Sequence, residues 1–327
     1  MLRTAVIGVG SLGSQHARIH AALAAEGLSQ FTTVCDLNEE TARAVSGERK
    51  TDWTTNWREL IGRVDAVSVA VPTEAHCEIA CELLESGIHV LVEKPIARTL
   101  DEADQMIRAA EKGDAVLQVG HLERFNPAMV ALRPHVRKPV YFEIHRVGQF
   151  TARSLDIDVV LDLMIHDLDI VQWLVGEDIE VTNIHAVGIA ILTNKVDAAN
   201  ARLEFSSGAV ANITASRVGT EKIRKMRFFQ PHDYIAIDYT TKRASISSLA
   251  PPGASGAWPG VHVKHLDIID VEPLRAEIVS FFEAASEGKP PAISGFEGRN
   301  ALSLALRTLE RIREHAEHPG VSELSVR

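Results

Sequence analysis

The sequence is poor in cysteine, which narrows both the compartment and the kinds of site to be expected. Its three cysteines are Cys35, Cys77 and Cys81, too few and too unevenly spaced for the disulfide framework of a small secreted protein. We therefore expect a protein of the reducing cytoplasm. Cys77 and Cys81 lie four residues apart beside His76, but no further ligand follows nearby in the sequence. Buried thiols on one helix explain this spacing better than a metal site, and we expect no bound metal.

Basic residues are also fewer than acidic ones. The chain has 34 lysines and arginines against 44 aspartates and glutamates, a formal net charge of −10, which disfavours non-specific binding to nucleic acid or to an anionic membrane. The longest stretch without these residues, 244–263, is broken by several prolines and glycines, so we predict a loop there and not a membrane span. The first residues also lack the basic segment, apolar segment and cleavage site of a signal peptide. We expect neither a nucleic-acid nor a membrane partner, and an anionic ligand would have to meet a local cluster of cations.

What the chain does have is enough apolar sequence for two domains. Its 327 residues, 46% hydrophobic and 24% charged, are typical of a globular protein of about two domains. Over residues 1–121, short apolar runs alternate with amphipathic stretches, as strands alternate with helices in βαβ units. The expected strands are 4–9, 31–35, 66–71, 89–92 and 115–119. This pattern predicts an α/β fold whose first domain, residues 1–121, is built on a doubly wound parallel sheet.

Residues 122–327 differ, because long alternating segments replace the βαβ pattern. Within 199–205, Ala201, Leu203 and Phe205 alternate with polar residues, so that one face of a strand is apolar. Further strands are expected at 140–147, 180–192 and 209–217, and closing helices at 273–287 and 296–315. These elements predict an α+β second domain with an open, mainly antiparallel sheet. Since a partly apolar open face needs cover, we expect self-association through this sheet, as a dimer or a tetramer.

A glycine-rich turn follows the first expected strand. Two glycines of the segment 8–13 allow a tight turn and close approach of the backbone, and the third lets the helix and the strand pack together. The N–H groups at the start of the helix can then hold a pyrophosphate. The residues expected around it are Gly8, Gly10, Ser11, Leu12 and Gly13.

Asp36 follows the second expected strand, twenty-three residues after Gly13. A carboxylate at this place accepts hydrogen bonds from the ribose diol of adenosine and repels a 2′-phosphate, which favours NAD over NADP. The alternative is a solvated aspartate at the start of the next helix. Ligands of such sheets bind beyond the carboxyl ends of the strands. That rule adds Pro72, Thr73, Glu93, Lys94 and His121 to the expected dinucleotide crevice.

Two short segments carry residues suited to proton and hydride chemistry. Lys94 lies at the carboxyl end of a strand, where Pro95 fixes the backbone and so aims the lysine. Asp162, His166 and Asp169 recur at spacings of four and three, on one face of an expected helix. A histidine at that place can accept the proton of a substrate hydroxyl. The alternatives are a helix-packing histidine and a surface lysine.

Taken in order, the motifs resemble the Gfo/Idh/MocA family of oxidoreductases over almost the whole chain. The segments that carry the resemblance are 8–13, 71–76, 93–95, 120–121, 124–127, 162–169, 272–274 and 298–302. It implies an NAD(P)-dependent oxidoreductase of sugars or related polyols, with a Rossmann domain joined to an antiparallel α/β domain. It further implies that Lys94 polarises the reacting hydroxyl, that His166 is the general base and that Asp162 shapes the proton path.

The same motifs place further residues at the two ligands. The resemblance implies that His76 and His121 lie at the cofactor and that Arg124 and Asn126 lie at the substrate. His121 stands where an aromatic residue is common in the family motif. The stacking contact of that ring is therefore not carried over to this chain.

A cationic run, 222–227, stands out in the acidic chain. In a strand, Lys225 and Arg227 share one face while Lys222 and Arg224 share the other, so that one pair can meet phosphates. The alternative is a solvated edge strand protected by its cations. Arg153 adds a cation shortly before the segment that holds His166.

These cations make the chain similar to family members that oxidise nucleotide-diphosphate sugars, such as the UDP-N-acetylglucosamine 3-dehydrogenases. The similarity implies hydride transfer from C3 of such a sugar, with Arg153, Arg224 and Arg227 among the substrate ligands. A free sugar or inositol as the substrate, and a dinucleotide-binding sensor without turnover, are the alternatives. Lys94, Asp162 and His166 favour an enzyme, because a pure binding module does not need a base aligned with an electrophile.

Overall fold

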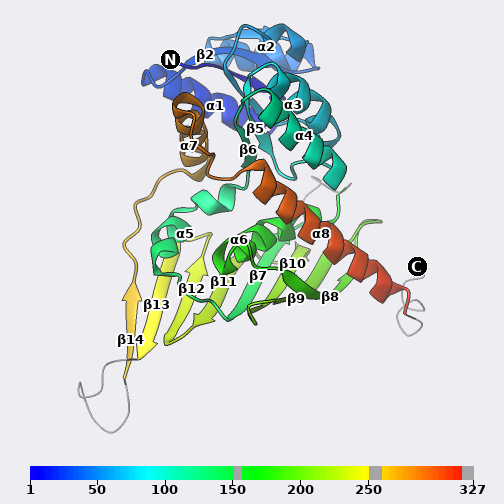
Figure 1. Ribbon diagram of the computed structural model, residues 1–327, viewed down its shortest axis with the longest axis vertical. Helices are drawn as coiled ribbons and strands as arrows, with labels where there is room; N and C mark the ends of the chain where they lie inside the picture. Colours follow the sequence, from blue (N-terminus) through cyan, green and yellow to red (C-terminus); the bar gives the residue numbers. More distant parts are fainter. Residues whose placement is uncertain (151–156, 250–259, 319–327) are drawn as a thin grey trace. The chain divides into compact units, whose positions relative to one another are not determined.

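The computed structural model describes residues 1–150, 157–249 and 260–318, and these residues form two compact units (Figure 1). Unit 1 consists of Met1–Leu122 and Glu272–Leu302, and unit 2 consists of Glu123–Val271 and Ser303–Arg327. The change of sequence pattern after residue 121 predicted that all later residues belong to the second domain. The structure instead groups the segment 272–302 with the first unit.

Unit 1 contains a parallel sheet of six strands in the order β3-β2-β1-β4-β5-β6, which confirms the predicted doubly wound sheet. The strands are β1 (Arg3–Ile7), β2 (Gln30–Cys35), β3 (Asp52–Thr54), β4 (Ala66–Val69), β5 (His89–Glu93) and β6 (Leu117–Gly120). The helices are α1 (Gly13–Ala25), α2 (Glu39–Arg49), α3 (His76–Glu85), α4 (Leu100–Lys112) and α7 (Pro273–Glu287), and α8 (Gly295–Ala316) begins in this unit. The short β3 was not predicted, and a 3-10 turn, Trp57–Leu60, follows it.

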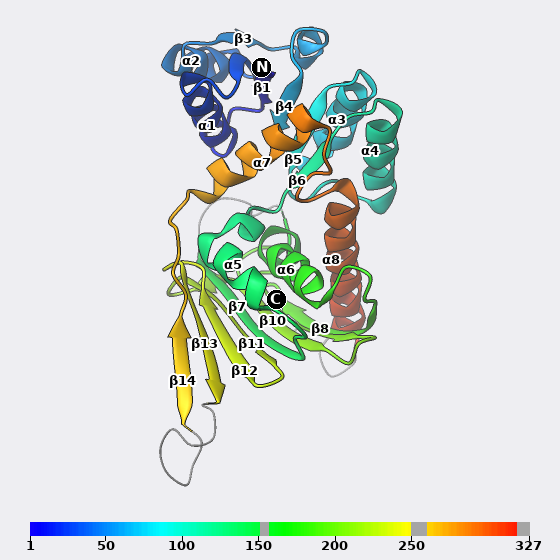
Figure 2. The same cartoon turned by 60° about the vertical axis from the view of Figure 1, so that its left-hand side comes forward.

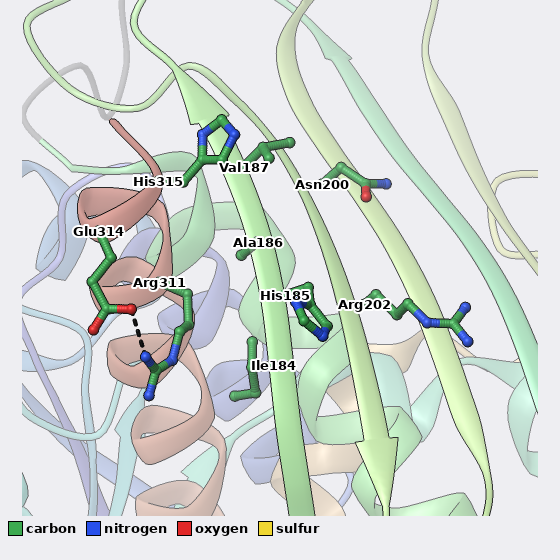
Figure 3. A pocket seen from close by; sticks show the side chains of 9 residues that line it. All are labelled: Ile184, His185, Ala186, Val187, Asn200, Arg202, Arg311, Glu314 and His315. Carbon is green, nitrogen blue, oxygen red and sulfur yellow. Dashed lines mark hydrogen bonds and ion pairs between the residues drawn. The ribbon is translucent and has the colours of Figure 1, made fainter. Parts of the chain in front are cut away.

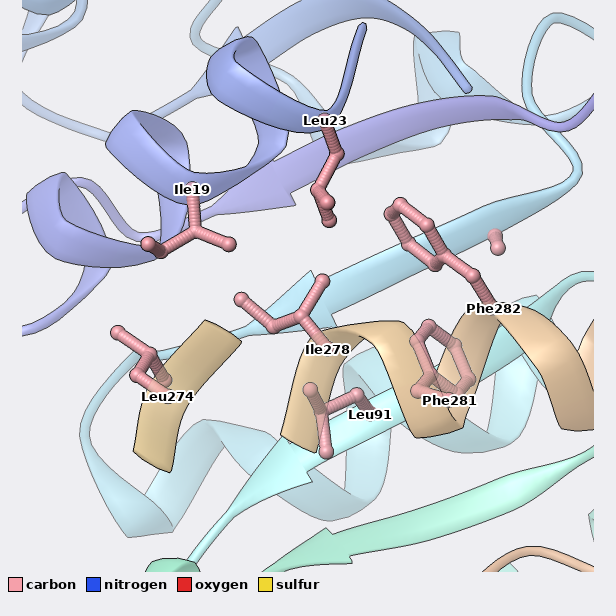
Figure 4. Packing of buried hydrophobic residues seen from close by; sticks show 8 residues of the cluster. Ile19, Leu23, Leu91, Leu274, Ile278, Phe281 and Phe282 are labelled. Carbon is pink, nitrogen blue, oxygen red and sulfur yellow. The ribbon is translucent and has the colours of Figure 1, made fainter. Parts of the chain in front are cut away.

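The hydrophobic core of unit 1 explains why α7 belongs to it. Leu274, Ile278 and Phe281 recur at helical spacing on α7 and are buried. They pack with Ile19 of α1 and Leu91 of β5 (Figure 4). Because burial of each such side chain contributes roughly 1.5–3 kcal/mol, this apolar face ties the helix to the sheet of unit 1.

Unit 2 contains a sheet of eight strands in the order β14-β13-β12-β11-β7-β10-β9-β8. The strands are β7 (Tyr141–Gln149), β8 (Val181–Ile189), β9 (Ala198–Phe205), β10 (Val210–Gly219), β11 (Ile223–Gln230), β12 (Asp233–Asp238), β13 (Arg243–Leu249) and β14 (Val261–His265). Neighbouring strands are antiparallel except β7 and β10, which are parallel. The mainly antiparallel sheet is thus confirmed.

Helices cover one face of this sheet (Figure 2). They are α5 (Pro127–Leu132), a π-helical turn (Val160–Met164) that leads into α6 (Ile165–Val175), and the later part of α8. Side chains alternate along β9 as predicted, because Ala201, Leu203 and Phe205 are buried. Within the described residues, no helix is both long and apolar enough to cross a lipid bilayer.

Two strand boundaries differ from the expectation. The stretch 244–263, expected as a loop, contributes residues to β13 and β14, while 250–259 lie outside the described residues. The strand expected to reach residue 192 ends at Ile189. The carboxylate of Asp197 accepts the N–H groups of Ile191, Leu192 and Thr193 at 2.7–2.9 Å, which folds that segment into a loop.

Candidate active site

Two of the three glycines in the turn between β1 and α1, Gly8 and Gly13, leave no room for a larger residue. Gly8 has a φ of +79°, and a Cβ there would lie 2.6 Å from the carbonyl oxygen of Ala70. A Cβ on Gly13 would lie 1.7 Å from the carbonyl oxygen of Gly8, whereas one on Gly10 would meet no atom within 4 Å. No side chain caps the start of α1. The N–H groups of Ser14 and Gln15 donate to the carbonyl oxygens of Gly10 and Leu12, each at 2.9 Å. The preceding N–H groups, those of Leu12 and Gly13, have no such bond within the described residues and can meet a pyrophosphate.

Asp36 supports the glycine loop from the end of β2. Its Oδ2 accepts the N–H of Val9 at 2.8 Å, and its Oδ1 accepts the N–H of Asn38 at 2.9 Å. Helix α2 begins only at Glu39, and Asn38 is its capping residue. Asp36 is thus not the start of that helix. Each carboxylate oxygen keeps a second lone pair, which can accept a ribose hydroxyl.

A cavity of about 490 Å³ lies along the carboxyl ends of β1, β2 and β4. Among the predicted residues, its lining includes Gly8, Gly10, Asp36 and Pro72. Ser11 and Leu12 are exposed in the glycine loop, and Thr73 begins the turn before α3. The open glycine, the uncapped helix and the carboxylate together fit the adenosine and pyrophosphate parts of NAD.

His76, expected at the cofactor, has its ring among backbone carbonyl groups. Its Nδ1 lies 3.1 Å from the oxygen of Pro95 and 3.2 Å from that of Ile96, and its Nε2 lies 3.0 Å from that of Val71. Burial lowers the pKa of His76, so the ring is neutral and donates from one nitrogen. It joins the segments that follow β4 and β5, which supports the crevice from inside unit 1.

The two thiols beside His76 also lack the surroundings of a metal site. The Sγ atoms of Cys77 and Cys81 lie 3.9 Å apart on α3. Burial raises the pKa of Cys81 to about 12, which keeps the sulfur protonated. In the ranges 1–150, 157–249 and 260–318, no group of three or more His, Cys, Asp or Glu side chains is placed to hold a metal ion.

Lys94 directly follows β5. It is half-buried between fully buried neighbours, and the carboxylate of Glu93 accepts its backbone N–H at 3.3 Å. Glu93 itself points inward, with its Oε1 2.8 Å from Nε2 of His16 on α1. His121, which follows β6, is buried as well. Glu93 and His121 therefore lie in the interior of unit 1, beside the strand ends that carry the crevice.

Asp162 and His166 lie in unit 2, where the π-helical turn meets α6. Both are half-buried, whereas the residues from 167 to 172 are buried. A partly exposed polar side chain at the start of a buried helix is accessible to a ligand. The sequence predicted a regular helix with Asp162, His166 and Asp169 on one face, but Asp162 lies in the π-helical turn, a kind of turn that often marks functional sites and that changes its spacing to His166. Asp169 points instead toward Arg124.

Arg124 and Asn126, expected at the substrate, make contacts inside unit 2. Arg124 binds both carboxylate oxygens of Asp169, at 2.7 and 2.9 Å, and its guanidinium lies 5.1 Å from the ring centre of Trp173. Asn126 caps α5 and donates to the carbonyl oxygen of Tyr239. Both side chains are buried, so a substrate contact would compete with these bonds.

A second buried arginine, Arg146, was not predicted from the sequence. Arg146 binds both oxygens of Asp167, at 2.7 and 2.8 Å, and Oε1 of Glu123 at 2.8 Å. Burial opposes the charge of Arg146, but the two carboxylates outweigh it and raise the pKa of the guanidinium. The spacing of residues in β7 could have revealed that Arg146 is buried. Phe142, Ile144 and Arg146 occupy every second position of this strand, and all three are buried. A charge at an inward position requires buried partners.

The two arginines predicted to bind phosphate lie on opposite faces of β11. Arg224 is on the helix-covered face, with its Nη1 3.6 Å from Oε1 of Glu123. Burial and the charge of Arg146 lower the pKa of Arg224, and Asp162 is among the carboxylates that act on it. Arg227 is on the open face, where it borders a cavity of about 250 Å³. Arg153 lies outside the described residues.

A further cavity, of about 510 Å³, lies beside the edge strand β8 (Figure 3). It is bordered by His185 of β8 and Arg202 of β9, and by Arg311 and Glu314, which form an ion pair on α8. None of the residues predicted to bind the cofactor or the substrate borders it. Despite its size, this cavity is therefore not the cofactor or substrate site that the sequence predicts.

Comparison with known proteins identifies both parts of the chain. Residues 2–121 match the model of the oxidoreductase family with an NAD-binding Rossmann fold, and residues 101–229 match the GFO/IDH/MocA C-terminal domain. The chain is 38% identical, over 94% of its length and 96% of the relative's, to the UDP-N-acetylglucosamine 3-dehydrogenase of Acidithiobacillus ferrooxidans.

Solved structures agree with this assignment. A structure of the Acidithiobacillus ferrooxidans UDP-N-acetylglucosamine 3-dehydrogenase matches with a TM-score of 0.88 and 37% identity, over 96% of this chain and 98% of that chain. Levoglucosan dehydrogenase in complex with NADH and levoglucosan matches with a TM-score of 0.83 at 19% identity, over 96% and 97% of the two chains, and shares the fold. The chain belongs to the Gfo/Idh/MocA family of NAD-dependent oxidoreductases.

Proposed function

We propose that the protein oxidises the 3-hydroxyl group of UDP-N-acetylglucosamine to a ketone, with NAD as the hydride acceptor. The observation that carries this proposal is the similarity to a UDP-N-acetylglucosamine 3-dehydrogenase, at 38% identity over 94% of the chain. Arg224 supports it, because this half-buried cation shares unit 2 with Asp162 and His166 and is acted on by the charge of Asp162. A guanidinium in such a place can bind a diphosphate.

In this proposal, the reacting hydroxyl group is acted on by three side chains, those of Lys94, His166 and Asp162. Lys94 donates a hydrogen bond to the hydroxyl oxygen and stabilises the negative charge that develops there. His166 takes the hydroxyl proton on a ring nitrogen, and Asp162 orients the imidazole. NAD, when bound, accepts the hydride from the carbon that carries this hydroxyl. The products are a ketone, NADH and one proton, so atoms and electrons balance.

The test compares three classes of substrate. The purified protein is mixed with NAD and, separately, with UDP-N-acetylglucosamine, free N-acetylglucosamine and myo-inositol, and NADH absorbance is followed. Reduction of the product with borodeuteride and NMR then locate the oxidised carbon, which we expect to be C3 of the nucleotide sugar. Turnover of only the free sugar or inositol would refute the proposed substrate. A thermal shift with ligands but without NADH formation would indicate a sensor instead of an enzyme.

Self-association through the open face of the sheet in unit 2 is a further part of the proposal. Large hydrophobic side chains are exposed on that face, among them Val187 of β8 and Phe229 of β11. The ring of Phe229 also contacts Tyr141 of β7. Burial of such a face favours a dimer or a tetramer. We also propose a cytoplasmic location, because the three cysteines are free thiols, as is usual in a reducing compartment. Light scattering should give a multiple of the monomer mass, which Phe229→Lys should reduce.

A further inference from the structure

Three ionisable side chains that the proposed mechanism leaves unused lie together inside unit 1. His16 on α1 and Glu277 on α7 are fully buried, and Glu93 at the end of β5 is 9% exposed. Glu277 lies on the same face of α7 as Leu274 and Ile278, which pack on α1 and β5 (Figure 4). Burial of ionisable side chains lowers the free energy of unfolding unless they are paired. We therefore expect these three residues to have a function other than packing.

The carboxylate of Glu93 is fixed on several sides. Its Oε1 lies 2.8 Å from Nε2 of His16, and its Oε2 accepts the backbone N–H of Lys94 at 3.3 Å. On the neighbouring strand β6, a Cβ added to Gly120 would lie 3.0–3.2 Å from the carboxylate atoms. Burial acts to raise the pKa of Glu93, but His16 and the charge of Lys94 outweigh it and lower the pKa. Glu93 is therefore ionised.

Glu277 completes the charge balance of this cluster. Neither of its carboxyl oxygens has a hydrogen-bond partner within the described residues. Burial and the negative charge of Glu93 raise its pKa well above the ordinary value, which favours the protonated form of Glu277. Glu93 is consequently the ionised carboxylate of the pair, and it serves Lys94 and His16 at the same time.

We infer that His16 and Glu93 are positioning residues that fix Lys94 relative to the dinucleotide loop. His16 lies in the first turn of α1, three residues after Gly13. The helix that offers its N–H groups to the pyrophosphate thus also holds the carboxylate that binds the backbone of Lys94. The inference rests on the proposed function in one respect, namely that Lys94 contacts the reacting hydroxyl. Loss of the pair misplaces Lys94 without removing its ammonium group.

The test uses amide hydrogen exchange of the cofactor-free protein, resolved at Lys94. In His16→Leu, the Lys94 amide should exchange about tenfold faster than in the wild type, because its acceptor is no longer fixed. His16→Gln keeps a donor near the place of Nε2 and should restore exchange to within about threefold of the wild type. With NAD and substrate, His16→Leu should lower kcat about tenfold and change the Kd for NAD less than about threefold. If His16→Leu does not fold, His16→Asn, whose amide is too short to reach Glu93, replaces it.

His20 provides the matched control, because it is a buried histidine one turn further along α1. Its ring nitrogens contact Thr4 and Ser68 and not Glu93, so His20→Leu should lower stability while exchange at Lys94 stays near that of the wild type. Equal acceleration in His16→Leu and His20→Leu, or unchanged exchange in His16→Leu, overturns the inference. The exchange measurement needs no turnover. It therefore judges the inference even if UDP-N-acetylglucosamine proves not to be the substrate.

Discussion

The guanidinium of Arg146 binds both carboxylate oxygens of Asp167, at 2.7 and 2.8 Å, in the interior of unit 2. Asp167 directly follows His166, and Arg124 binds Asp169, two residues further on, in the same bidentate manner. Because both ion pairs are buried, they anchor the N-terminal half of α6 at two points. A general base has to be held within a fraction of an ångström of its productive position. The two pairs supply that restraint for His166, the general base that we propose.

Replacement of Asp167 by asparagine should therefore lower stability and catalysis together. The variant leaves the buried charge of Arg146 only partly compensated, and such a loss typically costs about 3–5 kcal/mol. Urea denaturation measures this change, and steady-state kinetics should show a lower kcat with little change in KM. Glu85→Gln is the control, because it breaks an exposed ion pair with Lys112 and should cost less than about 1 kcal/mol. Equal costs in both variants would argue against the anchoring role of Arg146.

Substitution of Lys94 tests the role in charge stabilisation that we propose for it. Lys94→Met keeps the length of the side chain but removes the ammonium group, so we expect kcat to fall roughly 100-fold or more. The Kd for NAD, measured by calorimetry, should change less than about threefold, because the dinucleotide cavity does not depend on this charge. His166→Gln should lower kcat similarly. If both act on one hydroxyl, the double variant will lose less than the product of the two effects; independent, multiplicative losses would contradict a shared site of action.

Asp36→Ala tests the choice between the two nicotinamide cofactors. Loss of the carboxylate removes the acceptor for the ribose diol and the repulsion of a 2′-phosphate. The Kd for NAD should rise about tenfold or more while that for NADP falls. Because Asp36 also accepts the N–H of Val9, Asp36→Asn is measured beside it, since this variant keeps an acceptor oxygen without the charge. An unchanged ratio of the two dissociation constants in both variants would remove the assigned role.

The sequence predicted most of unit 1, because its signals are local. A glycine loop between β1 and α1, followed by Asp36 at the end of β2, depends on neighbouring backbone and is readable from spacing. In unit 2, the polar alternation predicted β9 and β10, whereas the prolines and glycines of 244–263 predicted a loop although the ends of that stretch belong to β13 and β14.

The contacts of the site were harder to foresee, because they join residues far apart in the chain. The partners of Arg146 are 21 and 23 residues away, and those of Arg124 are 45 and 53 residues away. The alternation along β7 marks Arg146 as inward-facing, but no neighbouring residue shows whether its partner is a carboxylate or a substrate phosphate. The π-helical turn at Asp162 was also hidden, since its spacing differs from a regular helix by a single residue.

Glu277→Met should stabilise the protein increasingly as the pH rises. Burial and Glu93 raise the pKa of Glu277, so the folded state keeps a proton that the unfolded state releases above about pH 4.5. Stability is therefore reduced above that pH, and removal of the carboxyl group removes the penalty. Near neutral pH, thermal unfolding should shift upward by at least roughly 2–4 °C. Glu283→Met, on the exposed side of the same helix, should show no such pH-dependent gain.

We expect His20 to lower the free energy of unfolding as the pH falls below about 6.5. Burial lowers the pKa of His20 to about 3, with a smaller contribution from His16, whereas a histidine in the unfolded chain has a pKa of about 6.5. The unfolded state therefore binds more protons below about pH 6.5, so stability is complete above that value and declines toward pH 3. Between about pH 7.5 and about pH 5.5, the loss due to this one histidine is about 1.4 kcal/mol. Urea denaturation at both pH values should show that His20→Gln loses correspondingly less than the wild type, while His262→Gln, at an exposed position of β14, loses as much as the wild type.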